Sequence, residues 1–201
     1  GGVSWIFPGV LENNVFRSDP VLASNDVGSF FYLSLLNSFF DNMWRSLDSG
    51  QSWNNLGPAT GGDKQWFAID NTNGTGHEFQ YQCWSTAGNN YGGRQFSRST
   101  DGGITWMDPI FLPNSPSWGT PDVDANGNLF IGGVNLNTGQ FWSLRSSNAR
   151  NGSAVPTFDR IVNVNLGGNL ADSSGINPAG LVGQVFLAAD RSGGATNNNI
   201  Y

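Results

Sequence analysis

Cysteine is nearly absent from this chain of 201 residues, because Cys83 is its sole example. A disulfide within the chain is therefore excluded, and a metal centre built on several thiolates is not expected. Charge is also scarce: charged residues make up 12% of the chain and the formal net charge is −6. This balance argues against nucleic-acid binding, which needs a basic face, and against electrostatic docking to anionic membranes.

Long hydrophobic runs are missing as well. The longest, SFFYLSLLNSFF at 29–40, is interrupted by Ser and Asn and is too short to span a bilayer. No signal-peptide pattern opens the chain, and the start GGVSWIF resembles the interior of a longer protein or a processed end. We therefore expect the chain to be part of a larger polypeptide. The abundance of Asn, Gly and Ser leads us to expect an exported protein, secreted or at the cell surface.

Short apolar or alternating runs separated by Gly, Asn, Asp and Pro clusters are present throughout, and they predict many short strands joined by turns. These runs fall into repeating units of strand, polar turn and strand. We expect the units at 15–57, 62–113, 119–167 and 180–201. In the first two units a third strand is followed by an Asp turn and a strand that begins with Trp. In the third unit Arg145 and Ser146 remain, but the Gly and Trp are lost.

Repeated four-stranded units predict an all-β fold, namely a β-propeller of antiparallel blades. The chain supplies about three and a half blades, whereas a closed ring usually needs about 4–8. Either the VSWIF segment at 3–7 completes a small four-bladed ring, or the chain is part of a larger ring. We favour the larger ring.

The Asp turn occurs twice, 53 positions apart, as SLDSGQSW and STDGGITW. Its members are Ser46, Asp48, Gly50, Ser52 and Trp53 in the first copy and Ser99, Asp101, Gly103, Thr105 and Trp106 in the second. An Asp carboxylate in a turn accepts bonds from nearby backbone N–H groups, and glycine adopts positive φ without steric cost. Each residue therefore has a structural task, and we predict no catalytic role for either Asp.

The pattern S-x-D-x-G-x-[ST]-W resembles the Asp-box, or bacterial neuraminidase repeat, of sialidase-like propellers. STDGGITW matches it fully and SLDSGQSW nearly so. The resemblance implies a ring of six, sometimes seven, blades with the Asp-boxes at the blade periphery. It indicates the fold more strongly than the function.

The resemblance also implies what a sialidase site would contain. Three arginines would clamp the substrate carboxylate, a Tyr with a Glu partner would be the nucleophile, and an Asp would be the acid–base catalyst. Phe16-Arg17 matches the start of the family's first arginine motif, but Ser18-Asp19 replaces its Ile-Pro. Arg17 is therefore a candidate clamp residue or a surface arginine. Arg45, Arg98 and Arg145 recur at equivalent positions, which favours a structural role. The complete catalytic set is not visible in this chain.

Asp19, Asp63 and Asp122 each stand at or near the first strand of a unit. First strands of propeller blades line the central channel, so these carboxylates are candidates for acid–base work there. The alternative, which we favour, is that they cap turns between blades. Lys64 and Trp66 are candidate ligand contacts beside Asp63, although for Trp66 we favour a place in the core. His77 fits a plain loop residue.

Three functions remain open from the sequence. The first is an Asp-box propeller that binds glycans or proteins. The second is an exo-sialidase-type glycoside hydrolase with part of its site outside this chain, and the third is a structural module of a surface protein. We predict no cofactor, no metal and no nucleic-acid partner.

Overall fold

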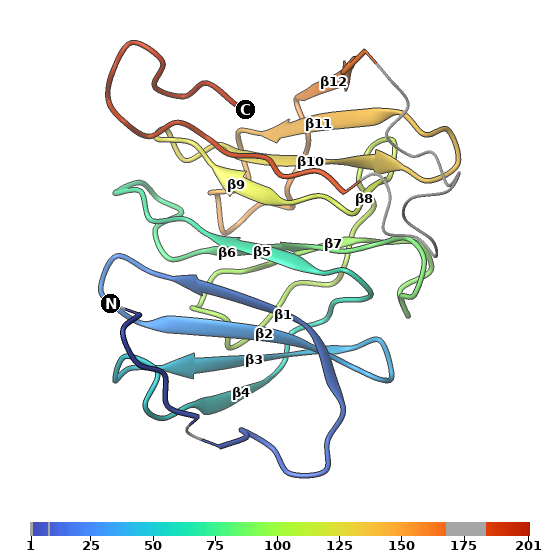
Figure 1. The fold of residues 1–201 in the computed structure, drawn as a ribbon. Helices are drawn as coiled ribbons and strands as arrows, with labels where there is room; N and C mark the ends of the chain where they lie inside the picture. Colours follow the sequence, from blue (N-terminus) through green and yellow to red (C-terminus); the bar gives the residue numbers. More distant parts are fainter. Residues whose placement is uncertain (1, 8, 168–183) are drawn as a thin grey trace.

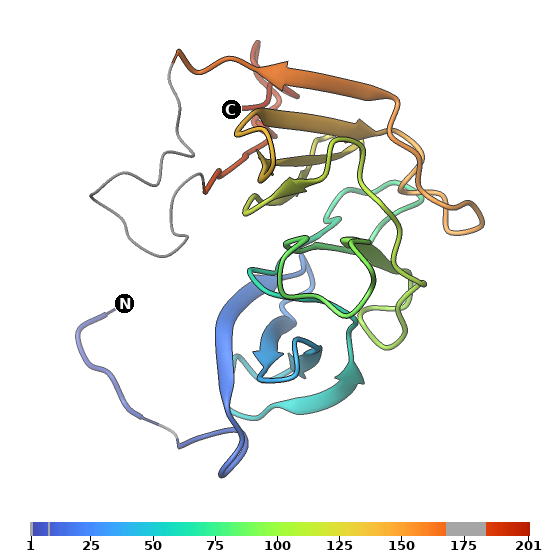
Figure 2. The same ribbon diagram turned by 90° about the vertical axis from the view of Figure 1, so that its right-hand side faces the viewer.

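The computed structural model describes residues 2–7, 9–167 and 184–201. Over these residues the chain is all-β, with twelve strands in three separate sheets. Figure 1 shows the sheets stacked one upon another along the sequence, and Figure 2 shows the same stack from the side. None of the described segments forms a helix long and apolar enough to cross a membrane.

The first sheet is a four-stranded antiparallel meander in the order β1-β2-β3-β4. Its strands are β1 (Arg17–Ser24), β2 (Phe30–Leu36), β3 (Asp41–Ser46) and β4 (Asn54–Pro58). Tight polar turns join them because Asn25 and Gly28 supply the bonds and the positive φ of the first turn. A register shift between Ser18 and Val21 bends β1 at its start.

The second sheet contains β5 (Trp66–Ile69), β6 (Gln80–Cys83) and β7 (Phe96–Ser99). The expected fourth strand is reduced to an isolated bridge between Phe96 and Ile110. Pro109 and Pro113 flank that bridge, and proline cannot donate to a sheet ladder. The prediction of four strands in this unit was therefore wrong for the described residues.

The third sheet has the order β12-β11-β10-β8, and β9 pairs with the other part of β10. Its strands are β8 (Pro116–Ser117), β9 (Pro121–Val123), β10 (Leu129–Asn135), β11 (Phe141–Ser146) and β12 (Arg160–Val164). After the third sheet, Val185 pairs in parallel fashion with Gly119, and Ala189 bridges to Ile200. The predicted unit 180–201 lies partly outside the described residues.

The inner strand β5 contacts both β1 and β9, so the three stacked sheets pack on one another through these strands. Apolar side chains fill the space between them in two clusters. One includes Leu33, Met43 and Phe67, and the other includes Tyr81, Phe96 and Leu129. Each cluster draws residues from two sheets, so neighbouring sheets share a core.

The N-terminal VSWIF segment does not complete a ring. Residues 3–7 form no strand, and Val3, Trp5 and Ile6 are each at least 89% exposed. Apolar side chains in a ring-closing strand would be covered by a neighbour. The four-bladed alternative therefore finds no support in this segment.

Candidate functional site

A polar cluster lies where the inner strands β1 and β5 begin. Asp19, at the start of β1, accepts a bond from the backbone N–H of Lys64 (3.1 Å). The Gln65 side chain donates to the Asp19 carbonyl (2.5 Å). Asp63, immediately before Lys64, is half-buried. The structure thus brings together three of the predicted residues, Asp19, Asp63 and Lys64, from two different sheets.

Asp41, at the start of β3, forms the buried base of this cluster. It is 1% exposed, and the Gln82 amide donates to its carboxylate (2.6 Å). Its backbone N–H donates to Thr60, and the Ala59 N–H donates back to the Asp41 carbonyl. Gly61, at φ 94°, leaves the carboxylate room, because a Cβ there would overlap Asp41. Asp41 therefore holds the 59–64 loop that carries Asp63 and Lys64.

Two carboxyl groups of the cluster, Asp41 and Asp63, have pKa values above those of ordinary surface acids. Burial raises the pKa of Asp41 well above its usual value, and the Asp19 carboxylate raises it further. Partial burial also raises the pKa of Asp63, with Asp19 adding to the effect and Lys64 opposing it. A half-buried carboxyl with a raised pKa next to a second carboxylate is the arrangement used in acid–base sites.

Arg17 lies beside the cluster but is engaged within the chain. Its guanidinium donates to Glu12 (2.8 and 2.5 Å) and to the Asn42 side chain (2.9 Å). Its charge lowers the pKa of Asp41, which is one of the smaller contributions there. A clamp on a substrate carboxylate would require Arg17 to exchange Glu12 for the substrate.

Asp122 and Trp66 both make contacts with the C-terminal segment. Asp122 accepts from the Ala189 N–H (2.7 Å) and pairs with Arg191 (2.7 Å), so it fastens β9 to the C-terminal segment. The Trp66 ring meets the Phe186 ring edge-on, with centroids 5.1 Å apart, and also packs against the first core cluster. The expected convergence of three inner-strand carboxylates thus joins Asp19 and Asp63 without Asp122. Asp19 and Asp122 both bind backbone N–H groups of the next unit.

The two Asp turns have the same internal geometry. The Asp48 carboxylate accepts from the Ser46 hydroxyl, the Ser52 N–H and the Ser52 hydroxyl (2.8, 2.8 and 2.5 Å). Asp101 accepts from Ser99 and Thr105 in the same way (2.8, 2.8 and 2.6 Å). Each Trp indole donates to the glycine carbonyl three residues before it. In the third unit Asn148 accepts from Ser146 and Thr157, so an amide oxygen replaces the carboxylate.

These turns lie at the opposite ends of the sheets from the polar cluster, because β3 and β7 end where the turns begin. Asp48 and Asp101 are exposed to solvent but saturated by their own turns. No part of the polar cluster touches them. They have the internal hydrogen bonds that the sequence pattern predicts.

An apolar cleft of about 650 Å³ lies elsewhere, between the third sheet and the C-terminal segment. Its walls carry the aromatic rings of Phe141, Trp142, Phe186 and Tyr201, with Arg145 at its edge. Neither Asp19 nor Asp63 lines this cleft. Asp124 and Arg160 also line the cleft, and aromatic walls with a few polar groups suit ligand binding.

Sequence reasoning did not find Asp41, Gln82 or Glu12. Asp41 follows two phenylalanines at a strand start, and its neighbour Gln82 stands in the middle of another strand. The one available signal was the GGD run at 61–63, because paired glycines mark a close backbone approach. A second group, Asp26, His77 and Glu78, was also missed, because its members come from separate turns.

Comparison with known proteins identifies neither a matching family model nor a matching curated protein. Among solved structures, the chain is similar to the α-L-arabinofuranosidase Arb93A from Fusarium graminearum, solved with an iminosugar inhibitor. The TM-score is 0.52 at 10% identity, over 76% of this chain and 50% of that one. A protein of unknown function from Dyadobacter fermentans gives 0.45 at 15% identity, over 73% and 50%.

At 10% identity the similarity to the arabinofuranosidase concerns the fold alone. It supports a β-propeller-like, all-β fold. The chain spans about half the length of the structures that it resembles. The class of the protein is thus an all-β chain with a β-propeller-like arrangement of antiparallel sheets.

Proposed function

We propose that this chain is part of an Asp-box β-propeller with a ring of six or seven blades. Two turns with the same side-chain bonds support the Asp-box assignment. Side-by-side inner strands and the resemblance to a propeller-like glycosidase support the ring. The proposal also places the protein outside the cell, secreted or at the cell surface.

We infer that its function is to bind a glycan or a glycan-bearing protein, with the polar cluster as the contact face. The observation that carries this is the 59–64 loop, which Asp41 and Gln82 hold from below. The loop presents Asp63 and Lys64 half-exposed beside Asp19. Because the loop is already held in place, its carboxylate and ammonium groups can bind sugar hydroxyls without a further loss of conformational entropy.

A glycan array with the purified chain tests this assignment. We expect a defined set of glycans to bind the wild type and to bind at least about tenfold less well to Asp63→Asn and Lys64→Gln. Asp108→Asn removes an equal charge from an exposed site elsewhere and should bind like the wild type. Equal binding by all variants would remove the polar cluster from the site. If only Trp142→Ala weakens binding, the aromatic cleft is the contact face.

A glycoside hydrolase is the second candidate, and the coupling of Asp19 with Asp63 favours it. With its raised pKa, Asp63 could donate a proton to a leaving oxygen, and Asp19 is the second carboxyl group beside it. Fluorogenic sialosides and arabinofuranosides are the substrates to try first. Turnover that Asp63→Asn abolishes would establish the enzyme, and loss in Arg17→Ala would add the arginine clamp.

If neither binding nor turnover is found with the full natural protein, the remaining proposal is a structural module of a surface protein. The shared cores between adjacent sheets support that role equally well. In that case, substituting Asp63 or Lys64 in the whole protein should change neither the ligands that it binds nor the substrates that it turns over.

A further inference from the structure

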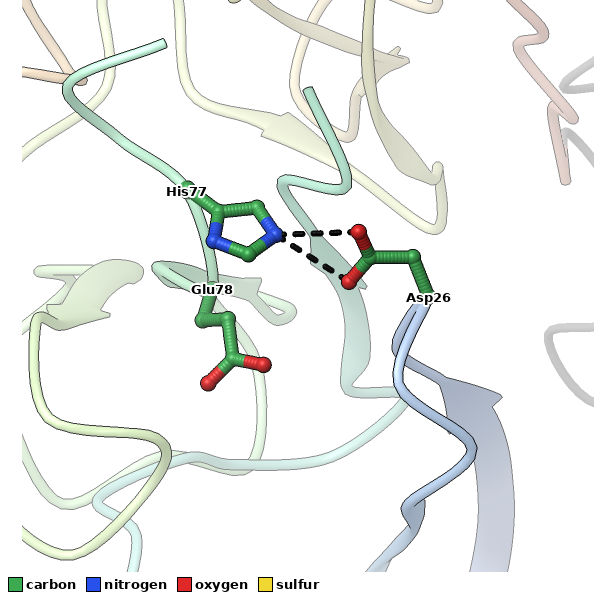
Figure 3. A group of neighbouring side chains, drawn as sticks. All are labelled: Asp26, His77 and Glu78. Carbon is green, nitrogen blue, oxygen red and sulfur yellow. Dashed lines mark hydrogen bonds and ion pairs between the residues drawn. The ribbon is translucent and has the colours of Figure 1, made fainter. Parts of the chain in front are cut away.

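A mixed group of metal-ligand side chains lies at the other ends of β1 and β5, away from the polar cluster. Asp26 belongs to the turn between β1 and β2, and His77 and Glu78 belong to the connection between β5 and β6. One ligand atom from each residue lies within 4.8 Å of the others. Figure 3 shows the imidazole facing the Asp26 carboxylate, with Glu78 below the ring. The group therefore spans two sheets.

The orientation of the three side chains is set by specific contacts. His77 Nε2 lies 3.1 Å from each carboxylate oxygen of Asp26. The side-chain amide of buried Asn25 donates to Glu78 Oε1 (2.9 Å). The Oδ1 atom of the same amide accepts from the Ser29 N–H (2.7 Å). Asn25 thus holds one Glu78 oxygen in place. Second-shell bonds of this kind orient carboxylate ligands in metal sites.

An ion pair between His77 and Asp26 would account for two members of the group but not for the third. Glu78 adds a second carboxylate next to the first, and neighbouring carboxylates repel each other unless a cation lies between them. Zinc ligand atoms at about 2.0–2.2 Å from the ion stand roughly 3.4 Å apart in a tetrahedron. The separation of 3.1 Å between His77 and Asp26 is close to that value.

We propose that Asp26, His77 and Glu78 bind a divalent transition-metal ion, for which Zn²⁺ is the fitting choice. One imidazole nitrogen with two carboxylates is a ligand set that zinc accepts, whereas Ca²⁺ and Mg²⁺ prefer oxygen ligands alone. Solvent reaches the group, so water completes the coordination. The ion joins the first sheet to the second and stabilises the folded chain by binding it in preference to the unfolded one.

The experiment uses the fact that His77 is the sole histidine in the chain. The purified protein is treated with a chelator, dialysed and titrated with Zn²⁺ while its single set of imidazole NMR signals is followed. We expect those signals to shift saturably with one equivalent, and the melting temperature to rise with zinc concentration. Ca²⁺ and Mg²⁺ should produce neither effect. Binding should weaken on acidification, because protons compete with the metal for imidazole nitrogen.

Two variants and one control complete the test. His77→Ala and the isosteric Glu78→Gln should each lower zinc affinity about tenfold or more, while Asp108→Asn, which alters a distant exposed carboxylate, should bind as the wild type does. The buried Cys83 thiol offers no competing site. The proposal is overturned if zinc leaves the imidazole signals unmoved, or if Glu78→Gln binds zinc as tightly as the wild type.

Discussion

Asp48 and Asp101 show how a single carboxylate can organise a whole turn. Each receives bonds from a serine two positions earlier and from the Ser or Thr four positions later. These bonds favour the ionised form, and those from Ser52 and then Ser46 contribute most to lowering the pKa of Asp48 to about 2. At Asp101 burial opposes the shift, yet the bonds from Thr105 and Ser99 still lower the pKa.

Replacing Asp101 with Ala should destabilise the fold by about 2 kcal/mol, because several charge-assisted hydrogen bonds are lost at once. Urea unfolding of the two proteins measures the difference. Asp108→Ala, at an exposed position, is the matched control and should differ from the wild type by less than about 0.5 kcal/mol. Equal values for the two variants would contradict the structural role of Asp101.

The contribution of Asp48 should depend on pH in the acid range. In the folded state its pKa lies below the ordinary value of 3.8. The stabilisation is therefore fully present above pH 3.8 and is lost as the pH falls towards 2. The stability difference between wild type and Asp48→Ala should therefore shrink between pH 4 and pH 2. A difference that stays constant over that interval would mean that the carboxylate charge is irrelevant.

The contribution of Asp41 to stability should depend on pH in the opposite direction. Burial raises its pKa in the folded state, so the native protein holds that proton more tightly than the unfolded chain. Stability then falls as the pH rises from the ordinary Asp value through the raised one. Asp41→Asn should abolish this decline and be at least as stable as the wild type at pH 8. Thermal melts of both proteins between pH 4 and pH 8 provide the measurement.

The turn and loop elements position these residues by close backbone approach. Gly61 has φ 94°, and a Cβ there would overlap the Asp41 carboxylate. Gly28 has a similar φ of 87° but open space around its Cα. Substituting Gly28 tests backbone strain alone, whereas substituting Gly61 tests strain together with steric overlap. The distinction matters because the 59–64 loop carries Asp63 and Lys64.

Gly61→Ala should destabilise the chain by about 2 kcal/mol more than Gly28→Ala, because overpacking adds to the shared strain of positive φ. Denaturant midpoints measure both variants. Gly61→Ala should also weaken any ligand contact made through Asp63 or Lys64, while Gly28→Ala should leave it unchanged. Similar stabilities for the two variants would show that the loop moves aside freely.

Across the whole molecule, side chains from one sheet hold the loops of the next. Buried Arg98 of β7 donates to the carbonyl oxygens of Ala149, Asn151, Gly152 and Ala154, which connect β11 to β12. The guanidinium also lies over the Phe79 ring. Arg145, at the equivalent place of the third unit, forms an exposed pair with Asp159 instead. One repeated residue thus has two different roles.

The same substitution at these two positions should have unequal effects. Arg98→Met should cost about 3 kcal/mol or more, because four carbonyl groups lose a charged donor inside the protein. Arg145→Met should cost less than about 1 kcal/mol, since exposed ion pairs contribute little. Calorimetry or chemical unfolding checks both. Comparable losses would contradict the proposal that Arg98 joins the second and third sheets.

Much of the local structure could be predicted from the sequence. Apolar or alternating runs at 30–36, 129–134 and 140–146 predicted β2, β10 and β11 to within one residue, because pattern and burial coincide there. The run at 43–47 predicted β3 but missed its first two residues. The missing fourth strand of the second unit shows the limit, since Pro109 and Pro113 interrupt an otherwise apolar run. Of the candidate site, Asp19, Asp63 and Lys64 were predicted, and Asp41 and Gln82 were not.

The Asp turns were determined by the sequence alone because every partner lies within four residues of the Asp. Such contacts form whenever the local chain bends, whatever surrounds them. Tertiary structure alone decided the rest: 45 residues separate Asp19 from Lys64, 41 separate Asp41 from Gln82, and 51 separate Asp26 from His77. These pairs meet because whole sheets pack through their inner strands, and no short-range pattern records which turns that packing brings together.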